Sequence, residues 1–349
     1  MRKNFLVFVV MILVLSGIFI GSAHAKDAKA KETNTVKVSG LLLGDYYWVA
    51  KNHLMDNDGQ TGFWVRRAYL TVDNDLSEQF SARLQLEMNQ NDFTATSTIT
   101  TPYIKSAYLK YTHSQHSVFL GISGTPTWNL VETHWGYRSI EKTPLDLQKF
   151  GSAVDGGIAF WGHFDQEKQW GYQLMAGNGA GTGSETNKSK KYYLALSNEP
   201  VKWLVFQLYG DYETNKLGTS DTSAYNMQGF VGIKGDSGRV GLLYDKNIQQ
   251  QGTGTADQKI ELASVYAVAN LNDAVSFVAR MDTLFDPNPK ADKISYIPMV
   301  KDAKSTLYLL GADFKLAEKI NIQPNVEWVT YSGNNESDLI PRVTIFYKF

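Results

Sequence analysis

The chain has 349 residues, and its 34 lysines and arginines nearly balance 35 aspartates and glutamates, so the formal charge is only −1. That balance argues against a nucleic acid partner, which would need a basic surface. The chain contains no cysteine, so packing and hydrogen bonds must stabilise it without disulfides. Its 17 Phe, 19 Tyr and 8 Trp residues suit the aromatic girdles of a membrane β-barrel, although a secreted β-sandwich can be equally aromatic.

The N-terminus has the pattern of an export signal. Arg2 and Lys3 precede an apolar run from Phe5 to Ile20, and Ala23-His24-Ala25 matches a small-x-small cleavage site. The run is shorter than the roughly 20 residues of a spanning helix, which disfavours the alternative of an uncleaved membrane anchor. We expect a cleaved signal peptide over residues 1–25, a short flexible periplasmic extension over 26–34 and a β-barrel over 35–349.

After the signal, apolar and polar residues alternate at every second position. In residues 80–89 the even-numbered side chains are apolar and the odd-numbered ones are polar. A helix would mix the two sets on every face, whereas a barrel strand turns one set to lipid and the other to the lumen. The same period recurs in residues 36–46, 67–73, 275–282 and 320–328, whereas residues 201–209 and 260–268 are fairly apolar on both faces.

Short and long connections alternate along the chain. Short polar turns are expected at Leu76–Gln79, His113–His116, Asp165–Gln169, Asn198–Pro200, Gly235–Gly238, Asn270–Asp273 and Ala317–Lys319. Longer stretches rich in Gly, Asn and Thr separate them, such as Asn91–Thr101, Asn178–Ser189, Thr214–Ser223, Lys246–Asp257 and Asp286–Lys304. Short periplasmic turns and long external loops are typical of outer-membrane barrels. Seven turns and eight loops predict an all-β fold, a 16-stranded antiparallel transmembrane β-barrel, which is wide enough for an aqueous channel.

The chain ends in a strand pattern, from Arg342 to Phe349. Val343, Ile345, Tyr347 and Phe349 share one face, and the last residue is aromatic. This resembles the terminal strand that outer-membrane assembly machinery recognises, so we expect the barrel assembly machinery to be a partner through the strand ending in Phe349.

The residues give little support to an enzyme. None of the histidines after residue 25 has a metal-ligand spacing such as H-E-x-x-H, and no serine and histidine fall together on adjacent strands as a lipase site would require. The glycine-rich run from Gly177 to Gly183 lacks the Lys-Ser/Thr of a phosphate loop. We therefore predict no catalytic residue, no cofactor and no metal.

Residues 123–152 form the longest connection, and a structureless loop of that length favours a functional role. Its charges nearly cancel, and five of them are candidates for a pore constriction: Glu132, Arg138, Glu141, Lys142 and Asp146. We expect this third long loop to fold into the barrel and narrow the pore; a solvated surface loop is the alternative. Polar-face positions of the strands supply candidates for the pore lining: Arg67, Asp73, Arg83, Glu87, Lys110, Arg280, Asp282, Glu327 and Arg342.

Three stretches carry a likeness to a known family. They are the paired arginines within Phe63–Leu70, the segments Ile104–Leu109 and Phe119–Pro126, and the segments Arg138–Asp146 and Ser152–Gly156. They resemble the general porin superfamily, in particular the phosphate-selective porin O and P type. The resemblance implies 16-stranded trimers with loop three folded into each pore.

The chain departs from the phosphate-selective type in its charges. Those porins line the channel with an arginine ladder and a lysine cluster, whereas only seven arginines follow residue 25 here, and predicted lumen positions such as Asp45, Glu87 and Glu327 are acidic. We expect a passive porin for small hydrophilic solutes in the outer membrane of a Gram-negative bacterium, surrounded by outer-membrane lipid and lipopolysaccharide, and a homotrimer by resemblance. The alternatives are a channel that prefers an anion, phosphate or a sugar, and a plugged structural or adhesive barrel.

Overall fold

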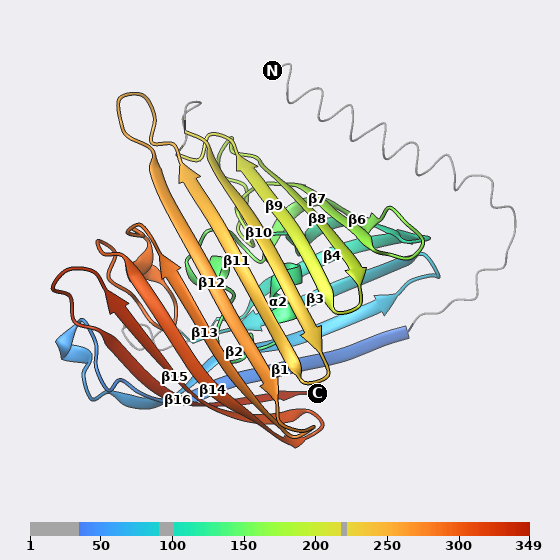
Figure 1. The fold of residues 1–349 in the computed structure, drawn as a ribbon. Helices are drawn as coiled ribbons and strands as arrows, with labels where there is room; N and C mark the ends of the chain where they lie inside the picture. The colour runs from blue at the N-terminus through green and yellow to red at the C-terminus, as the bar shows by residue number, and fades with distance from the viewer. Residues whose placement is uncertain (1–34, 91–100, 218–221) are drawn as a thin grey trace, which may run out of the picture.

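Sixteen antiparallel strands close into one barrel (Figure 1). The computed structural model describes residues 35–90, 101–217 and 222–349, so the expected signal peptide and the 26–34 extension lie outside the described residues. Each strand pairs with its neighbours in sequence, and β16 closes the barrel on β1. The predicted fold class is therefore confirmed.

The first eight strands are β1 (Thr35–Trp48), β2 (Thr61–Asp75), β3 (Phe80–Met88), β4 (Tyr103–His113), β5 (His116–Gly124), β6 (Val154–His163), β7 (Trp170–Gly177) and β8 (Lys191–Val201). The other eight are β9 (Leu204–Glu213), β10 (Ala224–Gly235), β11 (Gly238–Gln249), β12 (Gln258–Asn270), β13 (Val275–Leu284), β14 (Ser305–Ala317), β15 (Ile320–Tyr331) and β16 (Asp338–Lys348). The helices are short: η1 (Met55–Asn57), α2 (Asn129–Trp135), α3 (Pro144–Leu147) and η2 (Ala291–Lys293). In the part of the chain that the structure describes, no helix is both long and apolar enough to cross a bilayer.

The connections alternate as expected, with short turns at one end of the barrel and longer loops at the other. One turn lies elsewhere than predicted: β8 continues through Pro200 to Val201, so the turn falls at residues 202–203. The pairing of β8 with β9 shifts between Asn198 and Val201. A register shift of this kind is where a strand tolerates proline, which has no N–H to donate.

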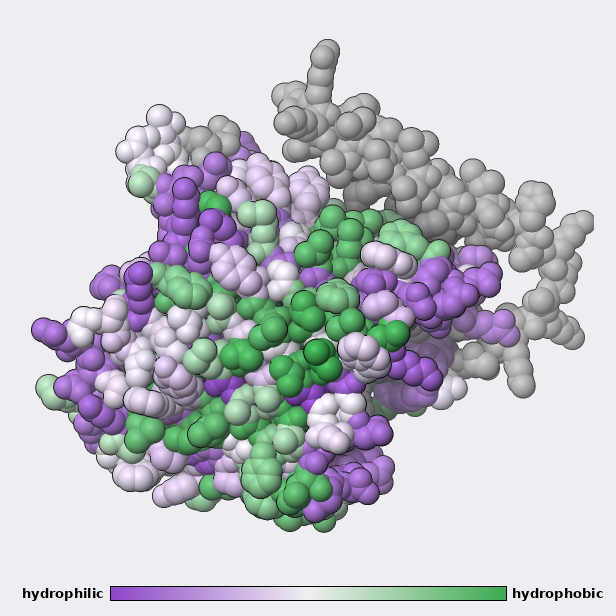
Figure 2. Space-filling model, viewed as in Figure 1, coloured by the Kyte–Doolittle hydropathy of each residue, from purple (hydrophilic) through white to green (hydrophobic). Residues whose placement is uncertain are grey.

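The two faces of the wall follow from the alternation. Outward-facing side chains such as Leu84, Leu120 and Leu242 are exposed, and Figure 2 shows hydrophobic side chains gathered between two hydrophilic ends of the molecule. Exposed aromatics near strand ends, such as Phe63 and Trp170, match the girdles of membrane barrels.

The apolar core lies against the inner face of the wall. One cluster joins Trp128, Trp135 and Phe150, from the β5–β6 connection, to inward-facing residues of β5 to β14. A second cluster joins Leu147 to the β13–β14 connection, residues 285–304, and to Trp64 of β2. Both long connections therefore pack against the barrel wall.

Candidate functional site

The candidate site is built around loop 3, residues 125–153 between β5 and β6. Its helix α2 ends at Gly136, whose φ of 70° is left-handed and whose N–H donates to the Glu132 carbonyl at 2.9 Å. A Cβ at Gly136 would lie 2.5 Å from Arg239 Nη2, so a side chain there would displace the guanidinium group of Arg239. Pro144 opens the first turn of α3, where a missing N–H costs nothing.

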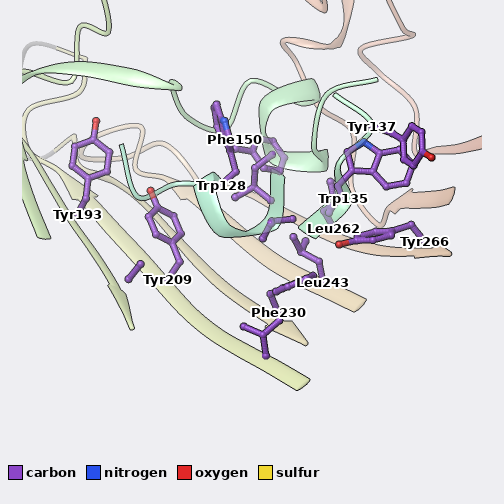
Figure 3. Close-up of a cluster of buried hydrophobic side chains, with 14 of the residues drawn as sticks. Trp128, Trp135, Tyr137, Phe150, Tyr193, Tyr209, Phe230, Leu243, Leu262 and Tyr266 are labelled. Atoms are coloured by element: carbon purple, nitrogen blue, oxygen red, sulfur yellow. The ribbon is translucent and has the colours of Figure 1, made fainter. Parts of the chain in front are cut away.

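One side of loop 3 is apolar and packs on β8 to β12. Figure 3 shows Trp128 and Phe150 above Tyr209, and Trp135 beside Tyr266. The Trp135 and Tyr266 ring centroids are 4.9 Å apart in an edge-on arrangement, which stabilises beyond the area buried. Aromatic packing therefore holds this side of loop 3 against the wall.

Four wall arginines donate hydrogen bonds to main-chain carbonyls of loop 3. Arg66 of β2 reaches the Ser139 and Ile140 carbonyls, the latter at 2.9 Å, and Arg342 of β16 reaches Ile140 at 3.1 Å. Arg239 of β11 donates to Trp135 at 2.9 Å, and Arg280 of β13 to Lys142. We call these four residues the arginine clamp. The clamp comes from two parts of the wall, since β2 and β16 flank β1, and β11 and β13 flank β12. It therefore fixes loop 3 from two directions.

Buried acids neutralise three of the four arginines of the clamp. Arg66 pairs with Asp45, Arg280 with Asp282, and Arg342 with both Glu327 and Glu141. The side chains of all these pairs are at most 1% exposed. Although burial acts in the opposite direction, the charges of Arg342, Lys142 and Arg66 lower the pKa of Glu141 to about 2, so it stays ionised.

A second set of charges, beside loop 3, is only partly buried. Arg67, Lys105, Glu132, Arg138 and Asp146 have side-chain exposures between 13% and 38%. Arg138 lies between Glu132 at 3.4 Å and Asp146 at 3.2 Å, while Arg67 and Lys105 flank Glu87 of β3 at 3.0 and 3.1 Å. We call these five residues the accessible charges. They place acids on loop 3 and two cations on strands β2 and β4.

Two irregularities in the pairing bring residues into the site that alternation could not predict. Between Leu43 and Asp45 the β1–β2 register shifts, so Val65 and Arg66 both oppose Gly44. An extra residue of this kind re-aims the chain, and both Arg66 and Arg67 make their ion pairs inside the barrel. A matching shift between Gln85 and Leu86 leaves Lys105 unpaired in the ladder and directed to Glu87.

The structure separates the predicted constriction residues. Glu132, Arg138 and Asp146 belong to the accessible charges, whereas Glu141 and Lys142 are buried. Lys142 lies 4.2 Å from the ring centroid of Tyr296, which Arg66 also approaches at 5.0 Å. Burial raises the pKa of Tyr296, but the charges of Arg67, Arg138, Lys142 and Arg66 outweigh it and lower that pKa to about 8.

The predicted lining residues divide in the same way. Arg83 and Asp73 form a pair at 2.7 Å that is about one third exposed, and Lys110 lies 5.4 Å from the ring centroid of Phe119. Arg67 belongs to the accessible charges. The remaining predicted lining residues point inward and are buried: Glu87, Arg280, Asp282, Glu327 and Arg342. Residues that the sequence did not single out for this site are Arg66, Lys105, Arg239 and Tyr296.

A large cavity opens on the short-turn side of α2. It has a volume of about 710 Å³ and is lined by Thr133, His134, Lys234 and Arg239, among others. His134 accepts or donates a 2.7 Å hydrogen bond with Tyr266 Oη, and burial together with Arg239 and Lys234 lowers its pKa to about 4. Among the described residues, no group of three histidines, aspartates or glutamates is arranged to hold a metal ion.

Comparisons with solved structures show the fold of outer-membrane porins. OmpF of Salmonella typhi, solved with daunomycin, is 10% identical with a TM-score of 0.65, covering 91% of this chain and 98% of that one. An anion-selective porin from Comamonas acidovorans is 11% identical with a TM-score of 0.64, covering 90% and 100%. OmpT of Vibrio cholerae in its trimer form is 13% identical with a TM-score of 0.59, covering 90% and 99%. Neither a family model nor a curated protein matches the chain.

Proposed function

We propose that the chain is an outer-membrane porin through which small hydrophilic solutes and ions diffuse passively. The observation that carries this proposal is the pairing of an apolar outer wall with accessible charges inside a closed 16-stranded barrel. Sixteen strands are enough to leave an aqueous channel. An apolar exterior and a charged interior suit a wall between lipid and water.

The accessible charges support a constriction between loop 3 and strands β2 to β4. Glu132 and Asp146 on the loop oppose Arg67 and Lys105 on the wall, with Arg138 between them. Opposed charges at a narrowing create a transverse field that orders passing ions and dipolar solutes. The formal charges of this group and Glu87 balance, so pore width would matter more than net charge.

The arginine clamp has a different role in this proposal. It holds the loop backbone in place by charge-assisted hydrogen bonds, which are stronger than neutral ones. Arg66, Arg280 and Arg342 are covered by the loop and are not offered to solutes, whereas Arg239 also lines the large cavity beside α2. A preference for phosphate, as in the phosphate-selective porins that the sequence resembles, would therefore depend on only a few accessible cations. We favour a general diffusion channel.

The partners follow from the same proposal. The exposed apolar belt would contact outer-membrane lipid and lipopolysaccharide, and the terminal strand would engage the barrel assembly machinery. A homotrimer is supported by the trimer form of the structural neighbour OmpT. Chemical cross-linking of the detergent-extracted protein would test the trimer directly.

Planar-bilayer recording tests the proposal against a plugged structural barrel. Purified, folded protein should give stepwise conductance that rises with salt concentration and shows no saturation with a particular ion. Folding is confirmed separately by gel migration that changes on heating. A folded barrel that gives no steps would contradict the channel and favour the plugged alternative.

Replacing Arg138 tests the location of the constriction. A fixed charge in a narrow channel acts on an ion with far more than the roughly 1 kcal/mol expected in bulk water at about 4 Å, so Arg138→Gln should shift the reversal potential in a salt gradient toward cations. Lys188, exposed in the β7–β8 connection, is the control, because external charges are screened within about 8 Å at physiological salt. Equal shifts for Arg138→Gln and Lys188→Gln would remove loop 3 from the constriction.

A further inference from the structure

A polar pocket lies at the long-loop end of the barrel, and none of the accessible charges lines it. It has a volume of about 210 Å³ and is formed where the end of loop 3 meets the β7–β8, β9–β10 and β13–β14 connections above strands β8 to β11. Its walls come from five separate parts of the chain, so the fold builds it. The predicted constriction and lining residues take no part in it.

The pocket carries an excess of positive charge. Four lysines line it, Lys149, Lys191, Lys216 and Lys290, against two carboxylates. Lys191 pairs with Asp211 at 3.1 Å and Lys216 with Glu213 at 2.7 Å. Four lysines against two carboxylates give the lining a formal charge of +2.

The lysines act on one another across this space. Burial lowers the pKa of Lys290, and the charges of Lys216, Lys191 and Lys149 lower it further, with Glu213 acting in the opposite direction. An ammonium group held near like charges is stabilised by any anion that enters. The net positive charge of the lining therefore favours an acidic ligand.

The floor of the pocket is suited to hydroxyl groups. Asn226 Nδ2 donates to Asp211 at 2.9 Å and to the Phe150 carbonyl at 2.8 Å, and Asn247 Nδ2 donates to Asn226 Oδ1. This network fixes the amides, while the side chain of Gln249 makes no hydrogen bond to the other described residues and faces the same space. Amides offer both donors and acceptors, as a polyol requires.

An aromatic ring and a glycine complete the pocket. The ring of Tyr193 lines it, with Lys191 Nζ 5.1 Å from the ring centroid. Gly179, at a φ of 79°, passes so close that a Cβ there would lie 3.1 Å from Glu213 Oε1. The volume of about 210 Å³ corresponds to about seven water molecules at about 30 Å³ each, which is the scale of a monosaccharide.

We propose that this pocket binds a monosaccharide that carries one acidic group, a phosphate or a carboxylate, at the entrance of the barrel. The lysines recognise the acidic group, and the amides and Tyr193 recognise the hydroxylated ring. Transport of the bound ligand through the barrel rests on the proposed porin function. Binding of the ligand to the pocket does not require conductance. The site would concentrate such solutes where they enter.

Calorimetric titration of the folded, detergent-solubilised barrel tests the site. The probes are glucose 6-phosphate, glucuronate, inorganic phosphate and glucose. We expect saturable binding of the two acidic sugars, with weaker binding of phosphate and of glucose. Lys290→Gln should weaken acidic-sugar binding about fivefold to tenfold, as for one lost charge-assisted hydrogen bond.

Lys293→Gln is the matched control, because Lys293 is exposed in the same connection and does not line the pocket. Equal weakening of binding by both variants would overturn the site. Binding of phosphate as tightly as either acidic sugar would also overturn it, because the pocket would then recognise the charge alone and not the sugar ring. Comparison of glucose 6-phosphate with glucuronate tells which acidic group is preferred. Because conductance is recorded separately, binding without conductance would refute the porin and leave the site standing.

Discussion

At the scale of single residues, identical chemistry has different consequences according to burial. Arg66–Asp45 and Arg83–Asp73 are both arginine–aspartate pairs on neighbouring strands, but the first is fully buried and the second is about one third exposed. Breaking a buried pair leaves an uncompensated charge, whereas water replaces the partner of an exposed one. The first pair should therefore determine stability and the second should not.

Arg66→Gln should lower the free energy of unfolding by about 3–5 kcal/mol. The change removes the cation of Asp45 and the donors to the Ser139 and Ile140 carbonyls, so loop 3 should also fluctuate and make the open-channel current noisier. Arg83→Gln should cost at most about 1 kcal/mol and leave the noise unchanged. The temperature at which the folded form loses its compact gel migration measures both. Similar losses for the two variants would show that the clamp does not hold the loop.

At the scale of secondary structure elements, α2 is the part of loop 3 that pH should affect. The His134 ring is buried between Tyr266 and Phe230, and a Cβ on Gly232 would lie 2.5 Å from its Nε2. With a pKa of about 4 in the folded chain against 6.5 for free histidine, the native state disfavours the protonated ring. Its contribution to stability is complete above pH 6.5 and is lost as the pH falls toward 4.

The expected result is a loss of thermal stability between pH 7 and pH 5 that is larger in the native chain than in His134→Gln. Glutamine can keep the hydrogen bond to Tyr266 and cannot take up a proton. Carboxylates titrate equally in both proteins, so the difference between the two curves isolates His134. Parallel curves would contradict the assigned role.

Alternation along the strands predicts the wall of this barrel well, because one face must be apolar wherever lipid lies. It could not predict the inward placement of Arg66 and Lys105, since a single extra residue in a strand changes which face follows. Residues 201–209 and 260–268, which are apolar on both faces, do indicate where loop 3 packs on the wall. Val205, Leu262 and their neighbours are apolar inside because loop 3 packs on them.

The charged residues of loop 3 show more clearly what could not be predicted from the sequence. Glu132 and Glu141 are the same residue type in one loop, and nothing in the sequence tells that one is accessible and the other is buried against Arg342. That distinction depends on arginines from β2, β13 and β16, which only the closed fold brings to the loop. Sequence could propose the loop as a site but could not divide its residues by role.

Strand β3 offers a direct test of which face meets lipid. Leu84 is exposed on the outer face, whereas Gln85 donates from inside to Thr71 Oγ1 at 2.8 Å. Arginine at a lipid-facing midplane position costs about 2–4 kcal/mol, so Leu84→Arg should reduce the folded yield in lipid vesicles and Gln85→Arg should not. Equal yields would mean that the assigned faces are wrong.

At the scale of the whole molecule, the barrel depends on one seam, where the last strand meets the first. An open edge in hydrocarbon would leave unpaired N–H and C=O groups at several kcal/mol each. The seam runs from Tyr47 opposite Arg342 to Leu41 opposite Lys348. Beyond it, the Phe349 backbone exchanges two 3.0 Å hydrogen bonds with Gly40, so the final residue completes the closure.

The aromatic ring of Phe349 packs against Gly40 of the first strand. A Cβ on Gly40 would lie 2.2 Å from that ring, so the first strand leaves room for the aromatic side chain of the last. Deleting Phe349 should remove both hydrogen bonds and the outer aromatic contact with Tyr347, and most of the chain should then stay unassembled in the periplasm. Phe349→Tyr, which keeps the backbone and the ring, should assemble normally. Cell fractionation and heat-dependent gel migration measure the outcome, and normal surface levels of the deleted form would show that β16 closes the barrel without its last residue.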